Sequence, residues 1–217
     1  MSAIFITDLH GHFDALEKLP PTNLLILGGD LTNFGTPQEF EAVVRMLRQR
    51  FTYVIGVAGN LDPGPAADGI LADFGMYVGL LIQNMNGYNL IGDSGSNKCP
   101  RPTPYEWDDE ERCKHLDCLG LPQVDILVTH APPYGFGADV IANGAHVGSK
   151  YVARLAEMTT PKVHCCGHIH EAAGIYDENG TVLVNPGPFG DEGNYAEITL
   201  PIDGARPIVT LKKVYDK

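Results

Sequence analysis

Seven side chains in this 217-residue sequence are oxygen or nitrogen donors of the kind that bind divalent metals, and each comes after a short apolar run. They are Asp8, His10, Asp30, Asn60, His130, His168 and His170. Any one of them alone would be an ordinary turn or surface residue. Five separate strand ends that all carry a ligand type favour a shared site, because the carboxyl ends of strands in an α/β sheet meet at one edge. The sequence therefore predicts a metal centre there.

Two pairs of these residues are separated by a single residue, in Asp8-Leu9-His10 and in His168-Ile169-His170. Because side chains alternate along an extended backbone, we expect each pair to present both ligands on one side. The seven donors are enough for two ions, and a shared carboxylate is the usual way to hold two ions about 3.5–4 Å apart. Mixed nitrogen and oxygen donors suit Mn²⁺, Fe or Zn²⁺ better than Mg²⁺ or Ca²⁺.

The elements that must position these residues are short strands alternating with amphipathic helices. Because the apolar runs are continuous, we expect strands that are covered on both faces. The runs fall at 3–7, 24–27, 53–57, 126–129 and 162–166, with two or three short strands within 76–93 and an antiparallel tail at 174–177, 182–185, 195–200 and 207–214. Glu178-Asn179-Gly180 carries the Asn-Gly signal of a hairpin turn.

Three helices are expected from their start signals. Thr36-Pro37-Gln38-Glu39 is a capping box with proline at the first helical position, and a stripe of apolar residues continues to Phe51. The same signal recurs at Thr103-Pro104-Tyr105-Glu106, where we expect a helix that ends at Gly120. A third helix is expected from Ser149 to just before Pro161. Together these elements predict an α/β fold with mixed sheets and helices outside.

Charge and composition exclude several classes of partner. The sequence has 27 acidic and 15 basic residues and a net charge of −12, which argues against a grip on nucleic acid and against a polybasic membrane anchor. Its apolar runs are too short to span a bilayer, and its first residues do not resemble a signal peptide. Five cysteines, two of them adjacent, make a poor disulfide framework. We therefore expect free thiols and a cytoplasmic location.

The order of the motifs resembles the calcineurin-like metallophosphoesterases, in particular the small metallophosphoesterase-domain proteins. The matching blocks are Asp8-Leu9-His10, Gly29-Asp30, Gly59-Asn60-Leu61-Asp62, Thr129-His130-Ala131-Pro132-Pro133 and Gly167-His168-Ile169-His170-Glu171. They occur in the family's order from residue 8 to residue 170.

The resemblance implies one metallophosphoesterase domain over residues 1–217, with a four-layer α/β/β/α sandwich of two mixed sheets flanked by helices. It implies that Asp8, His10, Asp30 and His170 bind one ion and that Asp30, Asn60, His130 and His168 bind the other, with Asp30 bridging. The activity implied is hydrolysis of phosphate esters by in-line attack of a metal-bridging hydroxide, with Asp30, Asn60 and His130 in catalytic positions. Mn²⁺ is the first choice of metal, and Fe, Zn²⁺, Ni²⁺ and Co²⁺ are alternatives.

One residue departs from the family pattern. Where most members carry a histidine that assists the leaving group, this sequence has Leu61. Loss of that group favours phosphodiesters over phosphomonoesters as substrates, and His12 or His146 could serve as a substitute proton donor. The same departure keeps open a scaffold or protein-binding role with little or no activity. A nuclease is a third hypothesis, which the net charge disfavours.

The expected partner is a small phosphoester, with a nucleotide as one candidate. No membrane is expected as a partner. A homo-oligomer is left open.

Overall fold

Two β-sheets form the centre of the computed structural model, which describes residues 1–116, 118–201 and 204–215. The five-stranded sheet has the spatial order β13 (Ile208–Lys213), β12 (Asn194–Thr199), β1 (Ser2–Ile6), β2 (Leu24–Leu27) and β3 (Tyr53–Gly56). The six-stranded sheet has the order β10 (Gly174–Glu178), β11 (Thr181–Asn185), β9 (Val163–Cys165), β8 (Ile126–Thr129), β5 (Tyr88–Asp93) and β4 (Gln83–Met85). Strands β1 to β3 are parallel, as are β5, β8, β9 and β11.

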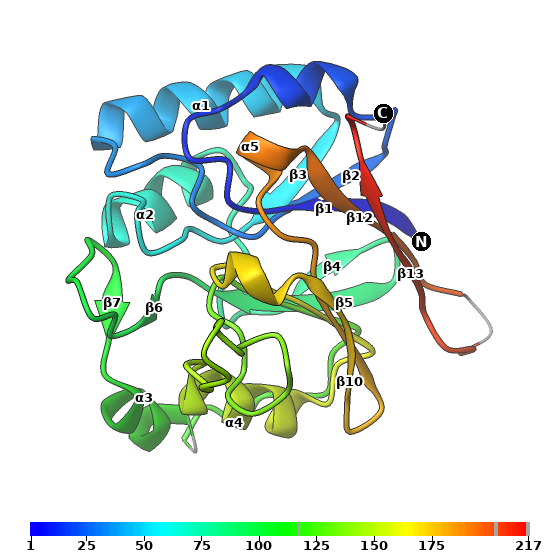
Figure 1. Cartoon of the computed structure of the whole chain (residues 1–217). Helices are drawn as coiled ribbons and strands as arrows, with labels where there is room; N and C mark the ends of the chain where they lie inside the picture. Colours follow the sequence, from blue (N-terminus) through cyan, green and yellow to red (C-terminus); the bar gives the residue numbers. More distant parts are fainter. Residues whose placement is uncertain (117, 202–203, 216–217) are drawn as a thin grey trace.

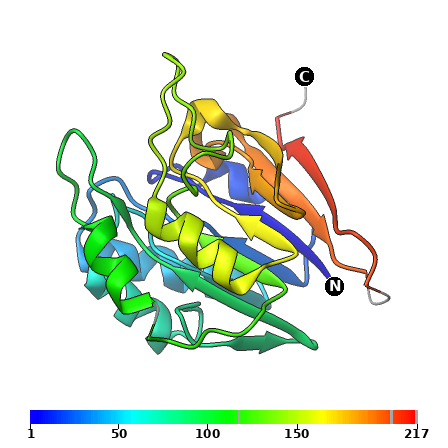
Figure 2. The ribbon, with the colours of Figure 1, turned by 90° about the horizontal axis from the view of Figure 1, so that it is seen from below.

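Helices cover the outer face of each sheet, so that the molecule has four layers (Figure 1). Helices α1 (Pro37–Arg50) and α2 (Pro65–Asp73) lie on the five-stranded sheet, and α3 (Asp109–Leu116) and α4 (Lys150–Thr159) lie on the other. Figure 2 shows α4, the yellow-green helix, lying over the strands of its sheet. The shorter elements are η1 (Asp14–Lys18), β6 (Ser96–Asn97), β7 (Glu106–Trp107), η2 (His170–Ala172) and α5 (Phe189–Glu192). The expected α/β/β/α sandwich is confirmed.

Alternation along the buried strands explains the layers. Phe5 and Ile26 pack between the sheets against residues such as Val128, whereas their neighbours Ile4 and Leu25 face the helix layer. Each strand therefore needs apolar residues on both faces, which is why its sequence reads as a continuous run. Among the described residues, no helix is both long enough and apolar enough to cross a membrane.

Two of the three expected helices begin where their caps predict. Thr36 Oγ1 accepts a hydrogen bond from the Glu39 backbone N–H, and the Glu39 carboxylate accepts one from the Thr36 N–H, which completes the capping box at the start of α1. Ser149 Oγ accepts from Val152 N–H at 3.0 Å and caps α4. The expected hairpin joins β10 to β11, with Asn179 in the left-handed region.

The prediction of a helix that starts at Thr103 is wrong. The Glu106 carboxylate does accept hydrogen bonds from the N–H and hydroxyl of Thr103, but these bonds close a turn, and the chain then enters β7, which pairs with β6. Helix α3 begins only at Asp109. The Asp108 side chain accepts hydrogen bonds from the backbone N–H groups of Glu110 and Glu111 in its first turn. Residue 117, inside the expected helix, lies outside the described residues.

The expected antiparallel tail is also corrected. Its first two strands, β10 and β11, belong to the six-stranded sheet, and its last two, β12 and β13, belong to the five-stranded sheet. Within the six-stranded sheet β11 runs parallel to β9.

Candidate metal centre

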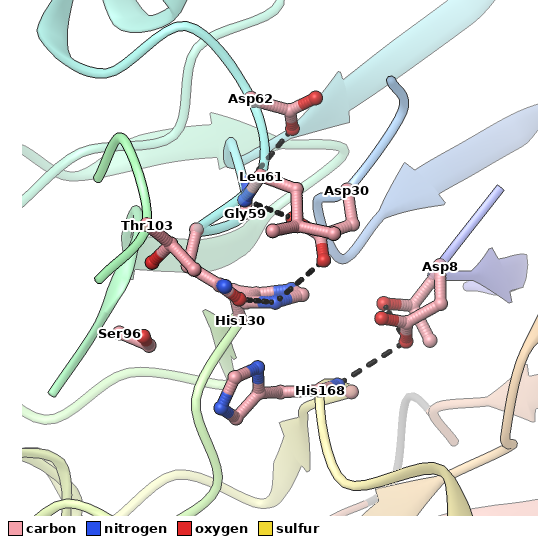
Figure 3. Close-up of polar contacts among 12 residues, drawn as sticks. Asp8, Asp30, Gly59, Leu61, Asp62, Ser96, Thr103, His130 and His168 are labelled. Carbon is pink, nitrogen blue, oxygen red and sulfur yellow. Dashed lines mark hydrogen bonds and ion pairs between the residues drawn. The ribbon is translucent and has the colours of Figure 1, made fainter. Parts of the chain in front are cut away.

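The candidate ligands of the sequence lie where the carboxyl edges of the two sheets meet. In the five-stranded sheet, Asp8 and His10 follow β1, Asp30 follows β2 and Asn60 follows β3. In the six-stranded sheet, His130 follows β8, and His168 and His170 follow β9. Figure 3 shows Asp8, Asp30, His130 and His168 pointing toward one region. Residues far apart in the chain, such as His10 and His170 at a separation of 160 positions, are thus brought into contact.

A first group contains Asp8, His10 and His170. Asp8 Oδ1 lies 3.2 Å from His170 Nε2 and 3.7 Å from His10 Nε2. The two histidine nitrogens are 3.3 Å apart. Each residue offers one ligand atom within 4.8 Å of the others, a spacing at which one ion could be shared.

A second group surrounds His130, which is fully buried. Its Nε2 lies 2.8 Å from Asn60 Oδ1 and 3.4 Å from Asp30 Oδ2, and its ring centroid is 5.0 Å from that of His168. Its Nδ1 is 2.8 Å from the Gly28 carbonyl oxygen, which can only accept, so Nδ1 is the donor there and Nε2 is the nitrogen that faces the other candidate ligands.

Two carboxylates connect these groups. Asp30 Oδ2 lies 3.4 Å from His130 and 4.0 Å from Nδ1 of His10, between one histidine of each group. Asp8 also lies within reach of Asp30 and His130, with ligand atoms within 4.8 Å of one another. By distance alone both carboxylates are therefore placed to serve two ions.

Backbone strain collects at these residues. Asp8, His10, Asp30 and His168 have φ angles of 57°, 49°, 49° and 68°, in the left-handed region that non-glycine residues rarely adopt. Such conformations cost about 1–3 kcal/mol each and persist where the surrounding structure holds them. We expected alternation along an extended backbone to bring Asp8 to His10 and His168 to His170. That reason is wrong, because both segments turn sharply and do not continue as strands. His170 likewise begins the η2 helix.

Two glycines of the motifs leave room for the carboxylates. A Cβ on Gly59 would stand 2.1 Å from Asp30 Oδ1, and a Cβ on Gly167 would stand 2.5 Å from Asp8 Oδ2. The buried Asp62 holds the same loops together, since its carboxylate accepts hydrogen bonds from the backbone N–H groups of Gly59 and Thr32. These contacts explain why glycine precedes Asn60 and His168 in the sequence.

The carboxylates and imidazoles of the cluster shift one another's pKa values. Burial alone would raise the pKa of Asp8, but the close approach of His170 and the charge of His130 hold it well below its ordinary value. Burial opposes protonation of His130, yet the charge of Asp30 and its hydrogen bond raise the pKa of His130 to about 9. Burial and the charge of His130 lower the pKa of His168 to about 4.

The remaining pKa shifts at the centre have similar causes. The Asp8 carboxylate, 3.2 Å from His170 Nε2, raises the pKa of His170. Burial and the charge of Asp30 raise the pKa of Asp62 to about 7.

Two buried polar atoms support a metal at this place. Asp8 Oδ1 and His10 Nδ1 have no hydrogen-bond partner among the described residues, although buried polar atoms are nearly always paired. Both belong to side chains that converge on the first group, and the donor set of carboxylates, an amide and imidazoles matches borderline divalent ions. The residues therefore fit a metal centre.

Not every residue singled out in the sequence joins the cluster. The exposed His12 is paired through Nδ1 with Asp191 of α5. Nδ1 of His146 lies 2.7 Å from the Asp139 carboxylate. Within the described part of the chain, neither histidine is hydrogen-bonded to a candidate ligand, so each would have to move or act through water to donate a proton.

Cys99 is a neighbour of the cluster that the sequence did not indicate. Its Sγ lies 3.7 Å from His168 Nε2, and burial raises the pKa of its thiol. It belongs to the irregular segment between β6 and β7, where no spacing signal connects it to the motifs. None of the five cysteines, all of which lie in the described residues, forms a disulfide.

Comparisons with known proteins agree with this geometry. The calcineurin-like phosphoesterase superfamily domain matches residues 1–202. An uncharacterized protein of Methanocaldococcus jannaschii is 34% identical over 203 residues, which cover 87% of this chain and 88% of that one. Human metallophosphoesterase domain-containing protein 1 is 26% identical over 84% of this chain and 64% of its own length.

A solved structure has the same fold. The crystal structure of the protein TT1561 of Thermus thermophilus is similar with a TM-score of 0.71 at 21% identity, and the match covers 98% of both chains. With the family domain matched from residue 1 to residue 202 and a relative 34% identical over most of both lengths, the chain belongs to the calcineurin-like phosphoesterase superfamily.

Proposed function

We propose that the protein is a phosphodiesterase that uses two divalent metal ions held by the clustered side chains. Membership of the superfamily supports metal-dependent hydrolysis of phosphoesters in general. The observation that carries the proposal is the buried Asp8 Oδ1, which accepts no hydrogen bond and lies among imidazoles and a second carboxylate, because a buried charged oxygen without a hydrogen bond is costly unless a cation lies beside it.

The side chains divide between two ions. Asp8, His10 and His170 would hold one ion, and Asn60, His130 and His168 the other. Asp30 would bridge them, because its Oδ2 lies between His10 and His130. When bound, the two ions supply Lewis acidity and lower the pKa of a water molecule. Mn²⁺ is the first choice of metal on the basis of the mixed donors.

The protein's own contribution is to orient the two carboxylates. Leu61 N–H fixes one oxygen of Asp30, and Thr7 Oγ1 and the His168 N–H fix one oxygen of Asp8. Each carboxylate is thus left with one free oxygen in a set direction.

A diester is the preferred substrate because the Leu61 side chain cannot give a proton to a poor leaving group.

Turnover of two substrates tests the proposal. The metal-free protein, reloaded separately with Mn²⁺, Fe²⁺, Co²⁺, Ni²⁺ and Zn²⁺, is assayed with bis-p-nitrophenyl phosphate and p-nitrophenyl phosphate. We expect the diester to be cleaved faster with Mn²⁺ and expect Asn60→Ala to abolish the activity. Asn84→Ala, which changes an exposed asparagine in β4, is the matched control. Absence of turnover with all five metals would overturn the proposal.

A binding role is the alternative, and exposed apolar side chains outside the centre favour it. Leu81 is 79% exposed and Ile82 and Leu119 are nearly half exposed. Exposed apolar surface of this kind is a feature of interaction sites. If turnover is absent, a stable complex lost in Leu81→Ser would support this role.

A further inference from the structure

A cavity of about 550 Å³ opens beside the candidate metal centre. His10 forms part of its wall, and Gly11, Phe13, Asn33, Phe34 and Val43 form much of the rest. The volume is within the range of sites that bind small molecules, roughly 300–1,000 Å³. A phosphoester whose phosphorus lies at the centre could thus place one of its two substituents here.

Phe34 is an unusual residue at the rim of this cavity. Its side chain is 60% exposed and its φ is 55°, a left-handed conformation that is rare for a bulky residue. Its backbone N–H donates to the Leu61 carbonyl at 3.1 Å, which joins its loop to the loop after β3. An exposed ring contributes little to the core, so folding does not account for a phenylalanine held in this conformation.

The charges around the cavity restrict what it can accept. None of the described residues that line it is lysine or arginine, and besides His10 its only ionisable side chain is Glu39. Glu39 Oε2 is held by the N–H and hydroxyl of Thr36, at 2.7 and 2.9 Å. A second phosphate would meet a carboxylate and no cation there. A neutral group would not be repelled.

We propose that this cavity binds one ester substituent of the substrate, and that this substituent is neutral and carries a planar ring that stacks on Phe34. The substrate class is then an aryl or nucleoside phosphodiester. The inference rests on the proposed function, since it takes the phosphoryl group to lie at the metal centre. Aromatic stacking does not depend on which planar ring is present, so an aryl group and a nucleobase would make the same contact with Phe34.

Binding of three phosphate monoesters tests the inference without turnover. Methyl phosphate, phenyl phosphate and adenosine 5′-monophosphate each carry one substituent, and their Kd values are measured by calorimetry on the Mn²⁺-loaded protein. In Phe34→Ala we expect Kd to rise about 5- to 100-fold for the two ring compounds and less than 2-fold for methyl phosphate. Phe34→Tyr should restore the parent values because it keeps the ring.

The controls separate the possible outcomes. Tyr53→Ala removes a ring that is 52% exposed at the opposite end of β3 and should change none of the Kd values. Tighter binding of adenosine 5′-monophosphate than of phenyl phosphate would identify a nucleoside as the source of the ring. Equal changes for all three ligands, no change in Phe34→Ala, or no binding of the ring compounds by the parent would overturn the inference. Hydrolysis of bis-p-nitrophenyl phosphate by the same sample reports separately on the proposed function.

Discussion

The backbone N–H of Leu61 donates a hydrogen bond of 2.8 Å to Oδ1 of the buried Asp30 carboxylate. The main chain therefore orients Asp30, and any residue except proline at position 61 keeps this contact. The half-buried side chain at position 61 is left to decide what the loop offers to a substrate. Substitutions at this position can consequently change the chemistry without removing a metal ligand.

Leu61→His should help poor leaving groups most. General-acid assistance is worth roughly 10²–10⁴-fold, so we expect alkyl diesters to gain on that scale and p-nitrophenyl diesters to gain little. Across a series of esters, the slope of log kcat against the pKa of the leaving group should become shallower. Metal content, measured on the same samples, should not change.

The control for this prediction is Leu61→Gln, which adds polarity but no acid. Asp62 will not orient the new imidazole, because its carboxylate is occupied by Gly59 and Thr32. A shallow slope in the parent protein would show that another donor acts. His12→Ala and His146→Ala would then be measured, and a slope that stays shallow in both would contradict this account of Leu61.

Gly59→Ala should disrupt the centre through its backbone. The new Cβ would stand 2.1 Å from Asp30 Oδ1, so the carboxylate must move. Overpacking of this kind costs about 1–3 kcal/mol, and each kcal/mol lowers Tm by about 2–4 °C in a chain of this size. We expect Tm to fall by about 2–12 °C in calorimetry and bound metal to fall by half or more.

Gly69→Ala is the matched control for that change. Gly69 lies within α2 with nothing within 4 Å of an added Cβ, so alanine there should stabilise by about 0.5–1 kcal/mol. A Gly59→Ala protein with the Tm and metal content of the parent would disprove the close packing against Asp30.

Metal stoichiometry distinguishes the two carboxylates. If Asp30 bridges, Asp30→Ala removes a ligand from both ions and should lose nearly all metal, whereas Asp8→Ala should retain about half. Elemental analysis of the purified variants measures this directly. Equal metal content in the two variants would contradict the assignment of Asp30 as the single bridge. A greater loss in Asp8→Ala than in Asp30→Ala would make Asp8 the bridge, since it also lies within reach of both groups.

Local signals in the sequence predicted local structure well. Leu24–Leu27 was expected as a strand and is β2, and the Thr36 capping box begins α1. Each depends only on neighbouring residues. The Thr103 signal failed because the same side-chain bonds can close a turn, and the conformation of the next residues was decided by the pairing of β7 with β6.

The site was predicted by residue type but not by geometry. Asp8 and His10 do lie together, yet left-handed turns bring them there and not the alternation of a strand. Whether a non-glycine residue adopts such a conformation depends on contacts from other loops, such as the bonds from the Leu9 and His10 N–H groups to the Asp30 carbonyl. Cys99 could not be predicted for the same reason, since its contact with His168 spans 69 residues.

A half-buried acid away from the centre gives the protein a pH-dependent stability. The Asp68 carboxylate accepts hydrogen bonds from the hydroxyls of Tyr105 and Tyr77, at 2.6 and 3.2 Å, while its Oδ1 is buried without a partner. Burial is the largest effect and raises the pKa of Asp68, and the hydroxyls of Ser94, Tyr105 and Tyr77 lower it in part.

The sign of the effect comes from proton linkage. The folded state holds the Asp68 proton to a higher pH than the unfolded state, whose pKa is 3.8. The contribution to stability is therefore full below pH 3.8 and is lost as the pH rises through the folded pKa, at about 1.4 kcal/mol for each unit by which that pKa is raised.

Asp68→Asn removes this loss, so the Tm of the variant minus that of the parent should increase between pH 4 and pH 7. Calorimetric scans of both proteins in matched buffers measure the difference, in which effects common to both proteins cancel. Tyr105→Phe makes the opposite test. It deletes a hydroxyl that lowers the pKa of Asp68, so the decline of Tm with pH should become steeper than in the parent. A Tm difference between Asp68→Asn and the parent that stays constant with pH would show that Asp68 is ionised equally in the folded and unfolded states.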